Sequence, residues 1–208
     1  FCHWFNATSA AGETPLPALA RAGLAHLYFE CIHPFEDGNG RIGRAVAEKA
    51  LAQGAGQPSL TALSLLIERR RKNYYAQLER ANKTLDVELW LDWFANLVLA
   101  AQAHTLQGLD FLLANTRLWD RLRGQLNARQ EKALPRLMRA GVDGFVGGLS
   151  TSKYMALTGT PAATARRDLG HLVKLGALRR TGQLKGTRYW LPHGQVANDG
   201  DIRIEDGS

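Results

Sequence analysis

Residues 33–41 read His-Pro-Phe-Glu-Asp-Gly-Asn-Gly-Arg, and this stretch decides how the N-terminal part of the chain is organised. Apolar residues recur at three- and four-residue spacing in residues 17–31, which predicts a helix that Pro34 ends. Apolar residues at helical spacing in residues 42–51 predict a second helix, which stops at Gly54. The quoted stretch is therefore expected to form a turn between two helices.

The turn has the residues needed to bind an anion. The glycines Gly38 and Gly40 flank Asn39, which tolerates unusual dihedral angles, so several backbone N–H groups can face one point. A helix that starts near Arg41 would direct the positive end of its dipole at the same point. Arg41 and Arg44 are three residues apart, hence neighbours on a helix surface, and their guanidinium groups suit phosphate oxygens.

Two further side chains could supply chemistry beside bound phosphates. Asp37 directly precedes the glycines, and a lone carboxylate next to phosphates is a usual way to hold Mg²⁺. The imidazole of His33 could take a proton from an attacking hydroxyl at neutral pH. A single histidine is more often structural, and Gly-Asn-Gly is usually only a turn. It is the ordered combination of base, metal ligand and anion site that favours phosphate chemistry.

Residues 33–44 resemble the complete signature of the Fic (Fido) proteins, His-Pro-Phe-x-Asp-Gly-Asn-Gly-Arg-x-x-Arg. The resemblance continues through residues 25–32 and through residues 74–82, which contain Tyr-Tyr-x-x-Leu-Glu-x-Ala-Asn. It covers residues 1–113 and implies a mainly α fold, a Fic-type helical bundle. It also implies a protein adenylyltransferase, which transfers AMP from ATP to a Tyr, Ser or Thr hydroxyl of a target protein.

The resemblance also implies a role for each matching residue. His33 is similar to the base that deprotonates the target hydroxyl, and Asp37 is similar to the Mg²⁺ ligand. Arg44 looks like the arginine that contacts the γ-phosphate or, in an inhibited state, an inhibitory glutamate. The residues implied in binding ATP are Gly38, Asn39, Gly40, Arg41, Arg44, Tyr74, Tyr75 and Asn82.

Some of these positions have a structural alternative. The spacing of Tyr74 and Tyr75 alone favours helix packing, whereas the resemblance favours contacts with the adenine and ribose. Phe35 is expected to be a core anchor for the loop. The β-hairpin flap and the inhibitory motif of the family are absent from the sequence, and we expect them upstream of Phe1.

The charge of the sequence changes after residue 126. Lys and Arg exceed Asp and Glu by one in residues 1–126 but by nine in residues 127–194, and residues 195–208 carry a net charge of −3. Helices are predicted at 129–140, 150–157 and 162–175, followed by two β-prone arms around a glycine-containing loop in residues 178–191. This order is typical of a winged helix-turn-helix domain.

The chain is therefore expected to be mainly α, with a Fic-type helical bundle followed by a small winged helix (α+β) domain. The expected organisation is a catalytic domain at 1–113, a connecting segment at 114–126, the winged helix-turn-helix domain at 127–194 and a flexible acidic tail at 195–208.

The basic domain suits duplex DNA, because neutralising phosphates is the main source of non-specific affinity. The residues expected to contact DNA lie at the start of the third helix and on the hairpin: Thr160, Thr164, Arg166, Arg167, Arg179, Arg180, Lys185 and Arg188. The alternative is a winged helix that binds protein or only supports the catalytic domain.

Other functions remain open from sequence. The same anion-binding turn could serve phosphoryl or other phosphate-group transfer, or removal of AMP from a protein. The chain could also be a DNA-binding regulator whose Fic-like half senses nucleotide. The expected partners are ATP, a target protein and duplex DNA, with a homodimer left open.

The composition sets further expectations. No membrane segment is expected, since no uninterrupted apolar run approaches about 20 residues. Two cysteines, expected to be buried, are too few for a disulfide framework or a metal knuckle, which fits a cytoplasmic protein.

Overall fold

The computed structural model describes residues 1–58, 61–84, 86–142, 145 and 147–193. It is mainly helical, as predicted, with one two-stranded sheet among the described residues. The contacts divide the chain into two compact units, one ending at Leu106 and the other beginning at Gln107. The expected acidic tail at 195–208 lies outside the described residues.

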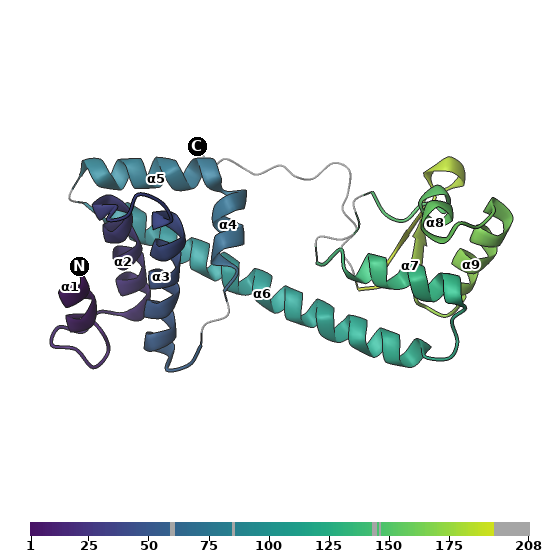
Figure 1. Cartoon of the computed structure of the whole chain (residues 1–208), viewed down its shortest axis with the longest axis horizontal. Coiled ribbons are helices and arrows are strands. Elements are labelled where there is room, and N and C mark those ends of the chain that lie inside the picture. Colours follow the sequence, from purple (N-terminus) through teal and green to yellow (C-terminus); the bar gives the residue numbers. More distant parts are fainter. Residues whose placement is uncertain (59–60, 85, 143–144, 146, 194–208) are drawn as a thin grey trace. The chain divides into compact units, whose positions relative to one another are not determined.

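The first unit is built around a tight pair of helices, α2 and α3, which lie side by side in Figure 1. Fully buried alanines, among them Ala25 and Ala47, let the two backbones approach closely. Trp90 and Phe94 fill the core beside them, and Trp90 Nε1 donates a hydrogen bond of 2.9 Å to the carbonyl of Gly23. The helices of this unit are α1 (Cys2–Ala7), α2 (Ala18–Ile32), α3 (Asn39–Ala55), α4 (Leu63–Arg69), α5 (Arg71–Lys83) and the first part of α6 (Glu88–Leu122).

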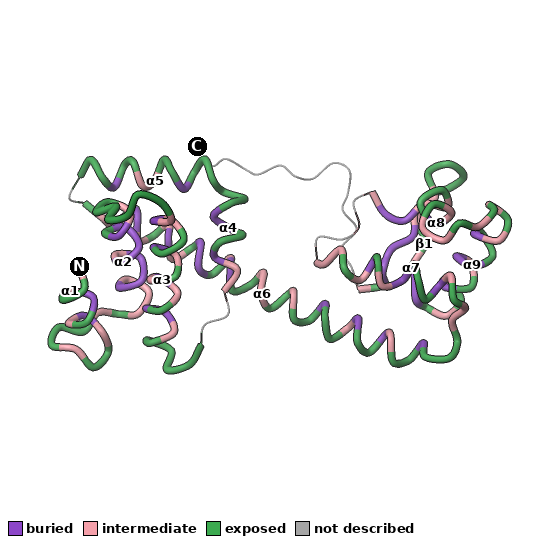
Figure 2. Tube along the Cα trace, in the orientation of Figure 1, coloured by how far each residue is buried: buried purple, intermediate pink, exposed green. Residues whose placement is uncertain are grey.

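Helix α6 is longer than the sequence predicts. Its pattern was expected to end near Leu113, with a polar interval from Asn115, yet the helix continues to Leu122. Leu118 and Leu122 are buried there, so one apolar face continues past the polar residues (Figure 2). Among the described residues, α6 is the one helix long and apolar enough to cross a membrane by length and composition, a test that the core helix of a soluble protein also passes. Trp90 is one of its buried residues.

The second unit contains the predicted series of helices and hairpin. These elements are α7 (Ala128–Met138), α8 (Thr151–Thr158), α9 (Ala162–Lys174), β1 (Arg179–Thr181), a 3₁₀ turn η1 (Leu184–Gly186) and β2 (Arg188–Trp190). The strands are antiparallel, with Arg179 opposite Trp190. Leu149 forms an isolated bridge with Tyr189, which ties the start of α8 to the hairpin. The sequence placed the N-cap of α9 at Thr160, whereas Pro161 occupies it, and no side chain caps this helix.

A buried carboxylate joins the three helices of this unit. Asp168 on α9 accepts hydrogen bonds from Arg129 Nε at 2.7 Å, from Asn127 Nδ2 at 3.1 Å and from the Tyr154 hydroxyl at 3.2 Å. These donors hold the pKa of Asp168 below its ordinary value, with the Arg129 hydrogen bond the largest cause. Asn127 and Gln130 also form a capping box at the start of α7. The network fixes α7, α8 and α9 against one another.

The prediction that the cysteines are buried is wrong. Cys2 and Cys31 are free thiols, and both are exposed. Cys31 lies near the end of α2, next to the candidate site, where the helix face turns toward solvent.

Candidate active site at the turn between α2 and α3

His33 ends α2 in a conformation that non-glycine residues rarely adopt. Its φ and ψ are 49° and 55°, in the left-handed region, and its N–H donates to the carbonyl of Phe29 at 3.0 Å. The following Pro34 disfavours the right-handed helical conformation for His33, so the helix ends where the sequence predicts. The imidazole is exposed at the start of the loop.

Asn39, not Phe35, anchors the loop. Asn39 is only 3% exposed, and its Oδ1 accepts a hydrogen bond from the Phe35 N–H at 3.0 Å. Its Nδ2 donates to the carbonyl of the same residue. Phe35 itself is 51% exposed and touches Phe29 with ring centroids 6.2 Å apart, so its expected role as a core anchor is wrong. The left-handed dihedral falls on Gly38, with φ of 86°, while Asn39 is the first helical residue of α3.

Each glycine of the turn faces an arginine. A Cβ added at Gly38 would lie 3.4 Å from Arg41 Nη2, and one added at Gly40 would lie 3.4 Å from Arg44 Nη1. The glycines thus let both guanidinium groups lie against the loop backbone. Arg44 is also held by Ser64 of α4, whose Oγ accepts a hydrogen bond from Arg44 Nε at 3.0 Å.

Asp37 remains accessible. Its Oδ2 is 3.3 Å from Arg41 Nη2, but the two side chains are 94% and 75% exposed. An exposed pair of this kind contributes little to stability, so the carboxylate can exchange this partner for another. The described residues contain no group of three or more His, Cys, Asp or Glu placed to hold a metal. A single open carboxylate beside an anion site fits Mg²⁺ held mainly by phosphate oxygens and water.

The other residues predicted to bind the nucleotide differ in their burial and contacts. Tyr74 is buried, and its hydroxyl lies 3.0 Å from His26 Nε2, as helix packing would require. Burial raises its pKa above the ordinary value. Tyr75 is 56% exposed, with the Arg71 guanidinium 5.9 Å from its ring centre, and Asn82 is exposed near the end of α5. In the described part of the chain, no hydrogen bond or ion pair joins Tyr75 or Asn82 to the loop.

A buried polar cluster behind the loop was not foreseen from sequence. Glu30 and His26 of α2 both face Gly43 of α3, with His26 Nδ1 3.2 Å from an added Cβ and Glu30 Oε1 closer still. Burial lowers the pKa of His26 to about 4 and raises that of Glu30, while His33 and Arg44 act to lower the Glu30 pKa. The spacing of His26, Glu30 and His33 by four and three residues could have revealed this shared helix face.

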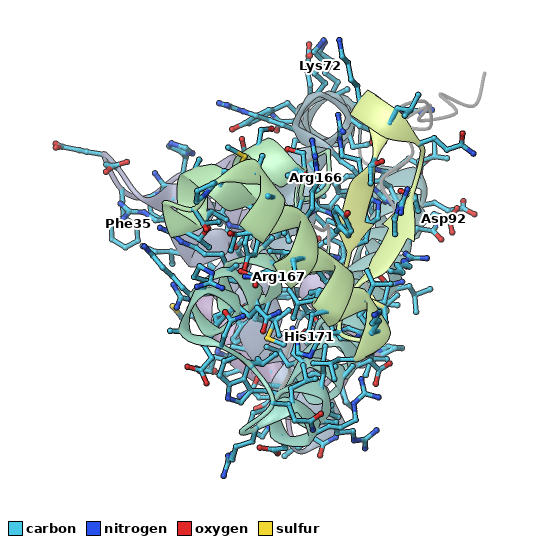
Figure 3. The ribbon with its side chains drawn as sticks, turned by 90° about the vertical axis from the view of Figure 1, so that its right-hand side faces the viewer. Phe35, Lys72, Asp92, Arg166, Arg167 and His171 are labelled. Carbon is cyan, nitrogen blue, oxygen red and sulfur yellow. The ribbon has the colours of Figure 1, made fainter. Side chains whose placement is uncertain are left out.

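The predicted DNA-contacting residues also differ in their surroundings. Arg166 and Arg167 are exposed on α9, and Figure 3 shows them followed by His171 along the same helix. The side chain of Arg188 is hydrogen-bonded within its own hairpin, because its Nη1 donates to the carbonyls of Lys185 and Thr187. Two of the other residues predicted to contact DNA are exposed, Arg180 and Lys185. Three are half-buried: Thr160, Thr164 and Arg179.

The N-terminal part of the chain is similar to known proteins. Residues 1–51 match the Fic/DOC family. Proteins named protein adenylyltransferase Fic from Drosophila virilis and Drosophila mojavensis are 33% identical in an alignment of 106 residues, and the alignment covers 43% of this chain. The chain spans only 20% of the length of these relatives. The likeness therefore supports a Fic-type transferase for the N-terminal part of the chain.

Proposed function

We propose that the turn between α2 and α3 is the active site of a protein adenylyltransferase. The enzyme moves AMP from ATP to a Tyr, Ser or Thr hydroxyl of a target protein. One observation carries this proposal: the exposed His33 begins the loop that leads into α3, where two arginines lie against Gly38 and Gly40. The name of the Drosophila relatives supports the same reaction class.

In this reaction His33 is the general base. The target hydroxyl oxygen forms a bond to the α-phosphorus of ATP while its proton passes to the imidazole. The bond between the α-phosphorus and the bridging oxygen breaks, and pyrophosphate leaves with that electron pair. His33 follows the last residue of α2 and is exposed, which leaves the imidazole open to a protein substrate.

The loop and the arginines bind the phosphates. Gly38 and Gly40 have no side chain to keep phosphate oxygens away from the backbone, and Arg41 and Arg44, which lie against these glycines, would donate charge-assisted hydrogen bonds. Ser64 holds Arg44 on the α4 side. Asp37 would hold the Mg²⁺ that accompanies the phosphates, and this ion would neutralise the charge that develops on pyrophosphate.

Label transfer tests the proposal. The chain is incubated with MgCl₂ and ATP labelled at either the α- or the γ-phosphate, with a cell lysate as acceptor. We expect α label on protein with wild type and with the control His3→Ala, whose histidine is exposed on α1, but not with His33→Ala. Equal α label with His33→Ala would show that His33 is not the base.

Two other reactions remain as alternatives on the same site. Phosphoryl or other phosphate-group transfer would place γ label, rather than α label, on protein. Removal of AMP would appear as a mass decrease of a previously modified target. We prefer AMP transfer because both arginines and the complete glycine turn are in place.

We infer a second function, duplex DNA binding, for the second unit, which has the element order of a winged helix. The observation that favours it is the exposure of Arg166 and Arg167 on α9, a helix that is held in the core by the buried Ala165 and Leu169. A regulator of this kind could use the first unit to sense nucleotide. The alternative is a winged helix that binds protein or supports the first unit.

Salt-dependent binding tests this second function. We expect wild type to bind duplex DNA more tightly as salt is lowered, and Arg166→Ala with Arg167→Ala to weaken that binding. Absence of binding even at low salt would rule out the DNA role.

A further inference from the structure

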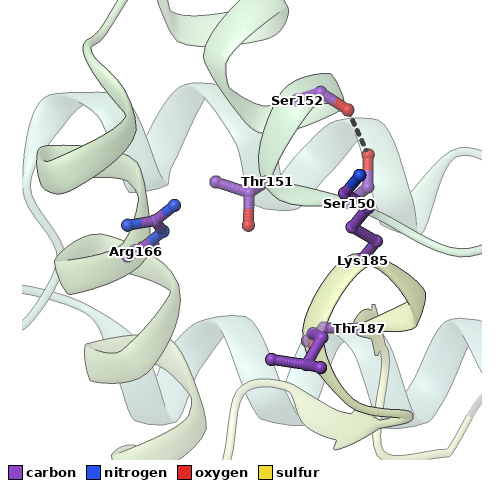
Figure 4. Close-up of a pocket in the computed structure, with 7 residues that line it drawn as sticks. Ser150, Thr151, Ser152, Arg166, Lys185 and Thr187 are labelled. Atoms are coloured by element: carbon purple, nitrogen blue, oxygen red, sulfur yellow. Dashed lines mark hydrogen bonds between the residues drawn. The ribbon is translucent and has the colours of Figure 1, made fainter.

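A pocket of about 510 Å³ opens in the second unit between the start of α8, the helix α9 and the turn η1. Figure 4 shows its lining. Six polar side chains line it: Arg166, Lys185, Ser150, Thr151, Ser152 and Thr187. They come from three separate elements, so the pocket depends on the fold of this unit and is not a local sequence feature.

The charge in the pocket has one sign. Arg166 and Lys185 approach from α9 and η1, and no carboxylate is among the lining residues that the structure describes. Neither side chain makes a hydrogen bond or ion pair within the described part of the chain. By contrast, Arg129 in the same unit is paired with Asp168. The two pocket cations therefore remain available to a ligand.

The hydroxyl groups are not equivalent. Ser150 Oγ accepts a hydrogen bond from the Lys153 N–H at 3.1 Å and lies 2.8 Å from Ser152 Oγ, so it is engaged in capping α8. Thr151 has no such partner among the described residues. Its hydroxyl points into the open space between Arg166 and Thr187 in Figure 4.

We propose that this pocket binds a phosphate group, and that the group belongs to the backbone of duplex DNA. Two cations and a free hydroxyl can all donate hydrogen bonds, which matches a ligand that presents several acceptor oxygens. The phosphate chemistry follows from the pocket alone, whereas the choice of duplex as its source rests on the proposed DNA role. Contact with a phosphate would fix the register of α9 on the duplex without reading its sequence.

The first test measures duplex binding by fluorescence anisotropy at several salt concentrations. The variants are Thr151→Val and the double variant Arg166→Gln/Lys185→Gln. Lys132→Gln/Lys174→Gln is the matched control, because it removes two exposed charges from the same unit outside the pocket. We expect the pocket double variant to weaken binding about tenfold or more. The slope of the logarithm of the binding constant against the logarithm of the salt concentration should also become shallower by about one. Thr151→Val should weaken binding less, and each loss should be equal for two unrelated duplex sequences.

The second test uses inorganic phosphate as the probe, with the amide resonances of the whole chain followed by NMR. We expect the Thr151 amide to shift on titration with wild type, and the shift to be lost in the pocket double variant.

The two tests separate the two proposals. If wild type binds duplex and the pocket double variant loses no more affinity than the control, the pocket proposal is overturned while the DNA role stands. If inorganic phosphate shifts Thr151 but wild type binds no duplex, the phosphate site is supported and the duplex is overturned as its source.

Discussion

At the scale of single residues, Gly43 shows how closely α3 packs against α2. An added Cβ there would overlap Glu30 Oε1 and crowd His26 Nδ1, whereas a Cβ at Gly108 of α6 would meet nothing within 4 Å. Both glycines are helical, so replacing either with alanine gains helix propensity of about 1 kcal/mol. The two positions therefore form a matched pair that separates crowding from propensity.

We predict that Gly43→Ala lowers the free energy of unfolding by about 1 kcal/mol relative to Gly108→Ala, because the Glu30 carboxylate must move and the buried His26 ring is crowded. Urea denaturation of the two variants measures the difference. Equal stability of the two variants would mean that Glu30 moves aside without cost.

His26 predicts a pH dependence with a definite sign. Burial depresses its pKa from 6.5 to about 4, so the unfolded chain binds a proton that the folded chain does not. Its contribution to stability is complete above pH 6.5 and is lost as the pH falls toward 4, on the order of 3 kcal/mol in total. The raised pKa of Glu30 has the opposite effect on stability, because the folded chain then binds a proton that the unfolded chain releases.

The measurement is therefore a comparison of urea denaturation for wild type and His26→Gln from pH 4 to 7. We expect the stability of wild type to fall more steeply with acid than that of the variant. Parallel curves would show that His26 is not neutral and buried in the folded protein.

The turn between two helices was predicted correctly from the sequence, but the structural roles of some of its residues were not. His33 and Asp37 lie in the loop between α2 and α3, and both arginines lie in the first two turns of α3, because a helix stop at Pro34 and two glycines leave the backbone few choices. Asn39 was singled out because it tolerates unusual dihedral angles, but Gly38 adopts the left-handed conformation and Asn39 supplies buried hydrogen bonds. Ser64 could not be foreseen, since its contact with Arg44 depends on how α4 packs.

At the scale of elements, the helices that begin or end at strong local signals were predicted closely. Helix α2 ends before Pro34, and α8 begins after the N-cap Ser150 and ends at Gly159, which has φ of 67°. Helix α6 was cut short because its polar residues were taken as a break, although the segment after Leu113 has neither glycine nor proline before Gly124. The helix continues through this segment because Leu118 packs in the second buried cluster.

The Asp168 network predicts unequal effects of two aspartate substitutions. Asp168→Ala removes the acceptor for donors on α7 and α8, and it should lower the free energy of unfolding by about 2–3 kcal/mol. Asp120→Ala breaks an exposed pair with Arg123 and should change stability by about 0.5 kcal/mol or less. Thermal unfolding of both variants tests this. A similar small effect for both would show that the buried network does not hold the helices together.

At the scale of the whole molecule, the two units have separate cores. Trp90 and Phe94 belong to one buried cluster, and Leu134 and Leu172 belong to the other. The sequence indicated this division through its charge, since the basic excess begins at residue 127. The contacts place the division at Leu106, because the end of α6 packs with the second core.

We predict that Leu172→Ala destabilises the second unit by about 2–5 kcal/mol through loss of buried apolar contacts. Hydrogen exchange should become faster in α7, α8 and α9 but stay unchanged in α2 and α3. Faster exchange throughout α2 and α3 would contradict the existence of two separate cores.

We propose that His33 promotes transfer of AMP to a protein hydroxyl. The most direct measurement is mass spectrometry of acceptor peptides after reaction with ATP and MgCl₂, using wild type, His33→Ala and His3→Ala. We expect an added AMP on a Tyr, Ser or Thr side chain with wild type and His3→Ala, and none with His33→Ala. The same modified peptides at the same level with His33→Ala would contradict it.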